Sequence, residues 1–158
     1  MSLLTHLPQV GGTDDWLTDP TIIHTLGPFT LDPACPDTMP WRTAKTMWTR
    51  RDGPLEREWF DLVWLNPPFS NWHTWTEKLA EHGDGIVLLP ARTDTRGFFE
   101  HVWSNPSAVC FVRGRVSFYT LGGIRSRDNC GFAICLVAFG KDAKRRLESC
   151  KFGRTVTL

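Results

Sequence analysis

The sequence predicts an α/β protein whose mostly parallel sheet has helices on both faces and an antiparallel strand pair near the C-terminal end. Between residues 61 and 112, short apolar runs alternate with segments of helical spacing. The apolar runs hold almost no polar residue, which is typical of strands buried on both faces. The chain has 158 residues, 41% of them hydrophobic and 22% charged. We therefore expect a single domain over residues 1–158, with 1–15 as a loose arm.

The first regular element is expected to be a helix over residues 21–26. Asp19 can cap its N-terminus, and Pro20 suits the first helical position. An apolar strand is expected over residues 29–32. Residues 36–58 are rich in proline, threonine and charge and show no clear period.

The remaining elements follow in regular alternation. We expect a strand at 61–65, a helix at 72–82, a strand at 85–89, a helix at 95–103 and a strand at 108–112. Two further apolar segments, 116–119 and 132–139, are separated by a loop with glycine and arginine. These two are expected to close the sheet as an antiparallel pair.

Charge and cysteine content narrow the class of protein. The formal net charge is +1, so a nucleic acid would have to be held by a local patch. No apolar run approaches the roughly 20 residues of a membrane helix, and the N-terminal residues carry no basic leader. The five cysteines include no Cys-x-x-Cys pair, and the histidines are scattered. These features predict a cytoplasmic protein with reduced thiols, no bound metal and no contact with a membrane.

The segment that directly follows the strand at 61–65 is Asn66-Pro67-Pro68-Phe69. Open α/β sheets bind ligands at the carboxyl ends of their strands. The two prolines fix the backbone and remove two N–H donors, which leaves acceptor oxygens on Asn66 and Pro67. Such a loop can orient an amine nucleophile, and Phe69 can stack on a base swung out of the duplex. The other interpretation is a strand end with a rigid turn and a core phenylalanine.

Six short motifs resemble those of the phage-type, Dam-like DNA N-6-adenine methyltransferases, in the same order over about residues 14–140. They are Trp16–Pro20, Leu31–Ala34, Asp52–Leu55, Asn66–Phe69, Leu88–Thr95 and Arg113–Arg115. The resemblance implies a reduced, Rossmann-like methyltransferase fold. It also implies S-adenosylmethionine as cofactor and the exocyclic amine of adenine in double-stranded DNA as substrate.

The resemblance also implies roles for single residues. The target amine would be bound by Asn66, Pro67, Pro68 and Phe69. The cofactor would be bound by Asp32, Pro33, Ala34, Thr18 and Asp52. Asp32 is expected to contact the methionine amine, and Asp52 the ribose or adenine. Thr18, with the N-terminus of the helix that follows it, is expected to hold the methionine carboxylate.

Four arginines without an intervening carboxylate lie between residues 113 and 127: Arg113, Arg115, Arg125 and Arg127. Beside an active site they would contact DNA phosphates, while the alternative is a solvated loop. Arg92 and Arg96 flank Asp94, so they suit either phosphate contact or an ion pair. The basic residues at 141–146 are expected on the solvated face of a C-terminal helix.

Two other functions remain open at this stage. The Asn-Pro-Pro-aromatic loop would also serve a methyltransferase that acts on RNA adenine or protein glutamine. Residues 35–37 read Cys-Pro-Asp where methyltransferases usually have glycines, which leaves room for an inactive DNA-binding relative. A domain this small has no separate target-recognition lobe, so two copies could share one duplex as a homodimer.

Overall fold

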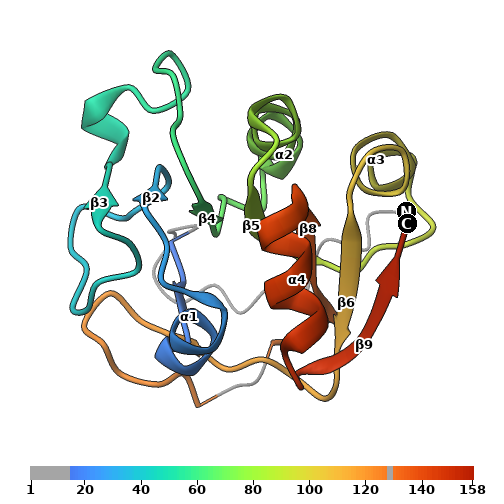
Figure 1. The fold of residues 1–158 in the computed structure, drawn as a ribbon. Helices are drawn as coiled ribbons and strands as arrows, with labels where there is room; N and C mark the ends of the chain where they lie inside the picture. Colours follow the sequence, from blue (N-terminus) through green and yellow to red (C-terminus); the bar gives the residue numbers. More distant parts are fainter. Residues whose placement is uncertain (1–14, 128–129) are drawn as a thin grey trace.

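A computed structural model describes residues 15–127 and 130–158. A seven-stranded sheet forms the centre of the fold (Figure 1). Its strands, in spatial order, are β3 (Thr46–Met47), β2 (Leu31–Asp32), β4 (Val63–Leu65), β5 (Gly85–Pro90), β8 (Ile134–Phe139), β6 (Ala108–Val112) and β9 (Gly153–Thr157). A separate two-stranded sheet pairs β1 (Leu17–Thr18) with β7 (Phe118–Tyr119).

The large sheet is mixed. Strands β3, β2, β4 and β5 pair in parallel, whereas β8 is antiparallel to both β5 and β6, and β9 is antiparallel to β6. Three of the six neighbour pairings are therefore parallel, so a mostly parallel sheet is not confirmed. The described residues between β6 and β8 form no helix that carries the chain back across the sheet. Strand β8 therefore starts where β6 ends and runs in the opposite direction.

The expected pairing of residues 116–119 with 132–139 is wrong. Both segments contain strands, but β7 pairs with β1, and β8 lies between β5 and β6. Strand β8 is buried along its whole length. The interior of the sheet offers it apolar neighbours on both sides, which a two-stranded ribbon with β7 would not provide.

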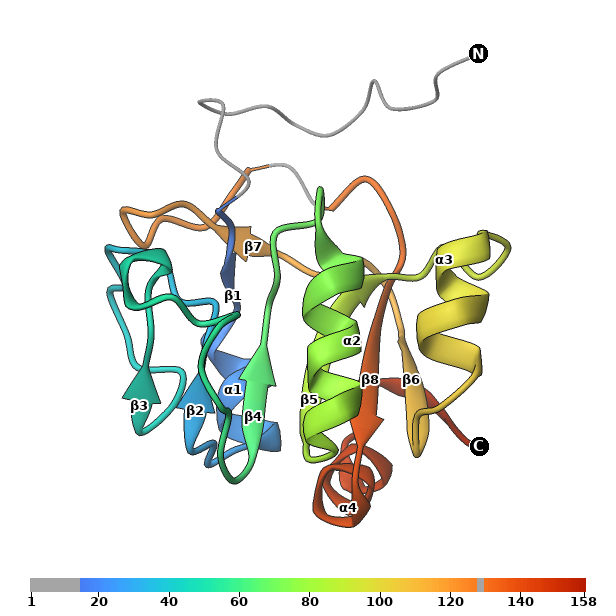
Figure 2. The same cartoon turned by 90° about the horizontal axis from the view of Figure 1, so that it is seen from above.

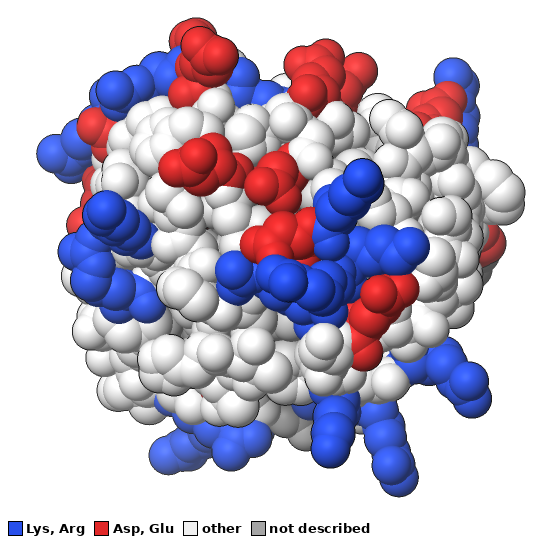
Figure 3. All heavy atoms as spheres, viewed as in Figure 1, with Lys and Arg blue, Asp and Glu red and all other residues white. Residues whose placement is uncertain are grey.

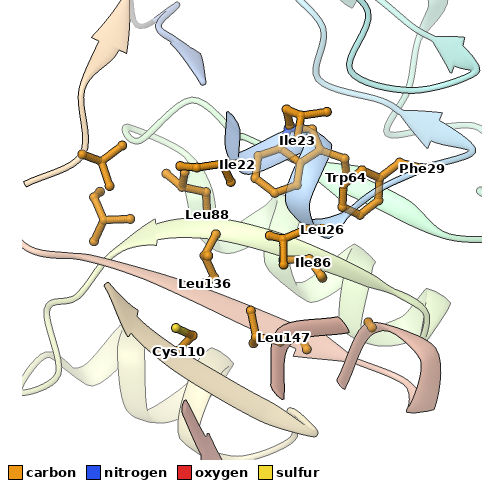
Figure 4. Packing of buried hydrophobic residues seen from close by; sticks show 14 of the residues in the cluster. Ile22, Ile23, Leu26, Phe29, Trp64, Ile86, Leu88, Cys110, Leu136 and Leu147 are labelled. Carbon is orange, nitrogen blue, oxygen red and sulfur yellow. The ribbon is translucent and has the colours of Figure 1, made fainter. Parts of the chain in front are cut away.

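Helices cover both faces of the sheet, as predicted (Figures 1 and 2). Helices α1 (Pro20–Leu26) and α4 (Lys141–Ser149) pack on one face, where Leu26 and Leu147 meet Ile86 and Leu136 (Figure 4). The other face carries α2 (Trp72–His82) and the continuous pair α3 (Arg96–Phe98) and η2 (Phe99–Trp103).

Strand β5 shows why the apolar runs of the sequence contain almost no polar residue. Ile86 and Leu88 belong to the cluster under α1 and α4, while Val87 and Leu89 belong to the cluster under α2. Successive side chains of a strand point to opposite faces, so a sheet covered on both faces needs apolar residues at every position.

The helix ends follow from local chemistry. The Asp19 carboxylate accepts a hydrogen bond from the Thr21 amide at 2.8 Å, and Pro20 begins α1 as expected. Gly83, with φ of 82°, ends α2. The helix expected at 95–103 begins as a short α-helical turn capped by Thr95 and continues as a π-helix, η2.

Three strands were not expected from the sequence. Strands β1 and β3 have two residues each, and β9 is an edge strand whose side chains are largely exposed. None of them carries an apolar run. Among the described residues, no helix is long and apolar enough to span a membrane.

Candidate active site

Strands β2 and β4 are parallel neighbours, and β3 lies on the other side of β2. The chain therefore leaves β2 toward one edge of the sheet and returns to its other side, which creates a switch point between β2 and β4. A cavity of about 250 Å³ lies beyond the carboxyl ends of these strands. Its walls include Thr18, Asp32, Ala34, Asn66, Pro68 and Leu121. The structure thus brings predicted cofactor residues and predicted catalytic residues into one cavity.

Asp32 is the last residue of β2 and is buried, with 4% of its surface exposed. Its carboxylate accepts hydrogen bonds from the Thr43 hydroxyl and from the Ala34 amide, the latter at 3.1 Å. Burial raises the pKa of Asp32 to about 6, although both hydrogen bonds lower it. No cation pairs with this carboxylate in the described part of the chain. A desolvated carboxylate of this kind favours a cationic ligand in the cavity.

Thr18 on β1 contributes a second polar group to the wall. It is 1% exposed, and its hydroxyl has no hydrogen-bond partner among residues 15–127 and 130–158. An unpaired buried hydroxyl costs free energy, so this group is suited to bind a ligand that enters the cavity.

The N-terminus of α1 is not available for the expected carboxylate contact. The Asp19 side chain already accepts from the Thr21 amide, and the Asp19 carbonyl accepts from the Ile22 amide at 3.0 Å. Pro20 has no N–H to offer. The sequence therefore correctly predicted a capped helix here, and the same cap excludes an external anion.

Asn66 follows β4, and its side-chain orientation is fixed. Its Nδ2 donates a hydrogen bond to the backbone carbonyl of Trp16 at 2.7 Å. The amide oxygen Oδ1 must then point the other way, and it has no hydrogen bond within the described residues. Pro68 lines the cavity with Asn66, and the buried Pro67 holds the loop between them.

Phe69 is placed beside the cavity and is not part of its wall. It is half-buried, with its ring centroid 6.2 Å from that of Phe118 and 5.8 Å from that of Phe132. The guanidinium of Arg92 lies 5.9 Å from the centre of the Phe132 ring. The alternative interpretation of Phe69 as a core residue is thus partly correct, since its ring packs with Phe118 and Phe132 and supports the loop on the side away from the cavity.

Two other predicted cofactor residues lie outside the cavity wall. Pro33 is buried in the turn after β2. Asp52 is exposed and accepts hydrogen bonds from the Thr49 amide at 2.8 Å and the Thr49 hydroxyl at 3.0 Å. These bonds lower the pKa of Asp52 and cap the short helix η1 (Arg50–Asp52). The structure gives Asp52 this capping contact and no place in the cavity wall.

Five polar residues of the wall were missed from the sequence: Asp15, Asp37, Thr38, Thr43 and Arg50. Arg50 pairs with Asp15 at 3.0 Å across the cavity wall. Three of the five, Asp37, Thr38 and Thr43, lie between β2 and η1, where the sequence has no period. The proline and threonine content of that segment was the only signal, and it indicates an irregular loop without identifying which side chains face inward.

The arginine segment 113–127 lies next to the cavity. Strand β7 within it pairs with β1, so that Phe118 is opposite Thr18, and Leu121 lines the cavity. All four predicted arginines are exposed and form no ion pair with any described residue: Arg113, Arg115, Arg125 and Arg127. Along the lower edge of Figure 3, where this segment runs in Figure 1, the visible charged atoms are positive.

The other basic residues differ in their partners. Arg96 pairs with Glu100 at 2.6 Å, whereas Arg92 forms no ion pair with Asp94 in the described part of the chain. On α4, both Arg145 and Arg146 pair with Asp142. Positive and negative groups are therefore mixed over α4 (Figure 3), which agrees with a solvated helix face.

Two histidines that are far apart in the sequence meet between α2 and η2. The ring centroids of His73 and His101 are 5.4 Å apart, and Trp72 stacks on His73 at 4.0 Å. Burial and the neighbouring His101 lower the pKa of His73. No three potential metal ligands gather in the part of the chain that the structure describes. Trp72 therefore supports this helix contact and does not line the cavity.

Comparison with known proteins identifies the family of the chain. No curated protein matches the chain. The sequence profile of one family, the DNA N-6-adenine-methyltransferases (Dam), matches residues 6–152, which includes every residue of the cavity wall. With nearly its full length matched, the chain belongs to the DNA N-6-adenine-methyltransferase (Dam) family.

Proposed function

We propose that this protein uses S-adenosylmethionine to methylate the exocyclic amine of adenine in double-stranded DNA. The observation that carries the proposal is that Asp32, Thr18 and Asn66 line one cavity. Membership of the Dam family supports the same reaction.

The strand arrangement supports a Rossmann-like methyltransferase fold. Strands β3, β2, β4 and β5 run in one direction, and β6 shares it because both β5 and β6 are antiparallel to β8. Helices lie on both faces, and the cavity lies at the switch point of the parallel strands.

The residues of the cavity fit the methionine end of the cofactor. The buried Asp32 carboxylate lacks a cation and would bind the ammonium group. The unpaired Thr18 hydroxyl would donate to the carboxylate. Thr43 and the Ala34 amide hold the Asp32 carboxylate in place, so its oxygens are oriented before a ligand binds.

Asn66 and Pro67 would orient the amine that receives the methyl group. The Asn66 Oδ1 and the Pro67 carbonyl can each accept one hydrogen of the adenine amine, which directs the nitrogen lone pair toward the cavity. When bound, the cofactor supplies an electrophilic methyl group. The two oxygens stabilise the positive charge that develops on nitrogen, and the surplus proton then leaves to solvent.

Contacts to DNA would come from the segment between β6 and β8. Its arginines, which form no ion pair with a described carboxylate, would bind phosphates near the target, and Phe69 would contact the extruded base from the edge of the aromatic cluster. Arg92 would extend this surface, because no described carboxylate neutralises it.

The test is transfer of labelled methyl from S-adenosylmethionine to unmethylated duplex DNA, to RNA and to a glutamine-containing peptide. We expect label on the adenine amine of duplex DNA alone. Label on RNA or peptide in place of DNA would favour the other amino-methyltransferase activities. Cofactor binding without any transfer would favour an inactive relative.

A further inference from the structure

Ile124 is the most exposed large apolar side chain in the described residues, with 70% of its surface accessible. A single exposed apolar residue is common in proteins and needs no explanation by itself. The surroundings of Ile124 distinguish it, since it lies in the turn after β7 and is followed by Arg125 and Arg127.

The turn that carries Ile124 is held firmly to the rest of the domain. The Thr120 amide donates to the Ile124 carbonyl at 2.9 Å, and Tyr119 forms a β-bridge with Arg125. The Trp41 ring meets Tyr119 edge-on, with 5.2 Å between centroids. The backbone beneath Ile124 is therefore fixed by contacts in which its own side chain takes no part.

Two further contacts fix the base of this turn. Gly123 lies against Pro40 so closely that a Cβ at this position would be 3.3 Å from the proline ring. The Arg125 guanidinium donates to the Ser117 hydroxyl at 2.7 Å. The β-branched side chain of isoleucine adds stiffness, because few rotamers are open to it.

The position of the turn points to its partner. Leu121, three residues before Ile124, lines the cavity, and β7 pairs with β1, which carries Thr18. Figure 2 shows β7 and β1 together at the end of the sheet to which β2 and β4 point. The turn thus carries a stiff apolar side chain next to arginines that form no ion pair with a described carboxylate, three residues from the cavity wall. Such a surface is complementary to a polyanion with an apolar interior, which is duplex DNA.

We propose that Ile124 inserts into the base stack beside the target adenine and fills the space that this base leaves when it enters the cavity. Apolar side chains that insert between base steps unstack them in this way. The inference rests on the proposed function and assigns the extrusion step to one residue outside the cavity wall.

The test uses two duplexes that carry the sequence found methylated after treatment of bulk DNA with the wild-type protein. In one duplex the target adenine is paired, and in the other it faces an abasic position, which lowers the cost of extrusion. Ile124→Ser should lower the single-turnover rate on the paired duplex by about tenfold or more. On the abasic duplex its rate should stay within about twofold of the wild type.

Two variants serve as controls. Ile124→Met keeps an apolar side chain and should retain the rate on the paired duplex. Phe99→Ser removes an apolar side chain of η2 that is 58% exposed and lies outside the cavity wall, and it should leave both rates unchanged.

Equal loss on both duplexes, or no loss on the paired duplex, would overturn the role of Ile124. If the wild-type protein methylated no DNA at all, the proposed function and this inference would fall together. Normal wild-type activity with a fully active Ile124→Ser variant would overturn this inference alone.

Discussion

The side-chain amide of Asn66 donates its hydrogen bond to the backbone carbonyl of Trp16, across 50 residues of sequence. This bond decides which end of the amide faces the cavity. The Nδ2 group is occupied, so the oxygen is the free end. The backbone just before β1 thus determines which polar atom the loop after β4 presents to the cavity.

Asn66→Ala should reduce methyl transfer by about 10²–10³-fold, because loss of one preorganised acceptor has a cost of this size. Cofactor affinity should stay nearly unchanged, since the Asp32 carboxylate is retained. Single-turnover kinetics and titration calorimetry measure the two effects. Asn71→Ala, on an exposed residue before α2, is the control and should keep full activity. A loss of less than about threefold for Asn66→Ala would contradict the role.

Cofactor affinity should rise with pH until Asp32 is ionised. The pKa of Asp32 is raised from 3.8 to about 6 by burial, so below pH 6 the cavity holds a neutral acid. Affinity should then fall about tenfold for each pH unit below 6 and level off above it. The folded state binds this proton more tightly than the unfolded state, so the ligand-free protein should lose stability as pH rises from 3.8 to about 6.

Thr43→Val should shift this pH profile upward by about one unit, because the Thr43 hydroxyl is a donor that lowers the Asp32 pKa. Thr43→Ser keeps the donor and should restore the wild-type profile. Calorimetric titrations at several pH values provide the measurement. A profile that only moves to weaker affinity, with the same midpoint, would mean that Thr43 acts through packing alone.

Thr18→Val should affect stability and affinity in opposite directions. Valine has a similar shape and removes a buried hydroxyl without a partner, so the ligand-free protein should gain about 1 kcal/mol of stability. Cofactor affinity should fall about tenfold because a hydrogen bond to a charged group is lost. Thr76→Val, whose buried hydroxyl donates to the Trp72 carbonyl, is the control and should not weaken cofactor binding. Unchanged cofactor affinity in Thr18→Val would mean that the methionine carboxylate of the cofactor is bound by another group.

Replacement of both Arg125 and Arg127 with serine should weaken binding to every duplex and flatten the salt dependence. Each lost phosphate contact should reduce the slope of log affinity against log salt by about 0.9. The choice of adenine should not change, because phosphate contacts position a protein without reading sequence. The matched control is Lys144→Ser with Arg145→Ser on α4, where carboxylates already neutralise both cations. A changed site preference would instead place Arg125 or Arg127 in a groove.

The sequence predicted well those elements that have a strong local signal. The apolar runs at β4, β5 and β6 and the helix α2 lie where periodicity indicated, and Asp19-Pro20 marked the start of α1. The Asn66–Pro68 loop and Asp32 lie at one cavity because parallel neighbours end at the same edge of the sheet.

Pairings between strands and side chains that are far apart in the sequence were harder to predict, because a local pattern does not identify the partner. Strand β8 could have paired with the strand before it, yet its apolar positions on both faces are satisfied only between β5 and β6. Thr43 gave no signal, because its role comes from a hydrogen bond to Asp32 across an irregular loop. His73 and His101 meet only because α2 and η2 pack side by side.

The small sheet of β1 and β7 connects the proposed cofactor site with the proposed DNA-binding segment. Thr18 on β1 lines the cavity, while Phe118 opposite it leads into the turn with Arg125. A ligand that orders one strand also orders its partner, so binding at the two sites should be thermodynamically coupled. Such coupling is reciprocal, and DNA must strengthen cofactor binding by the same factor by which the cofactor strengthens DNA binding. The two residue pairs between β1 and β7 would then be enough to make DNA affinity lower in the cofactor-free protein than in the cofactor-bound protein.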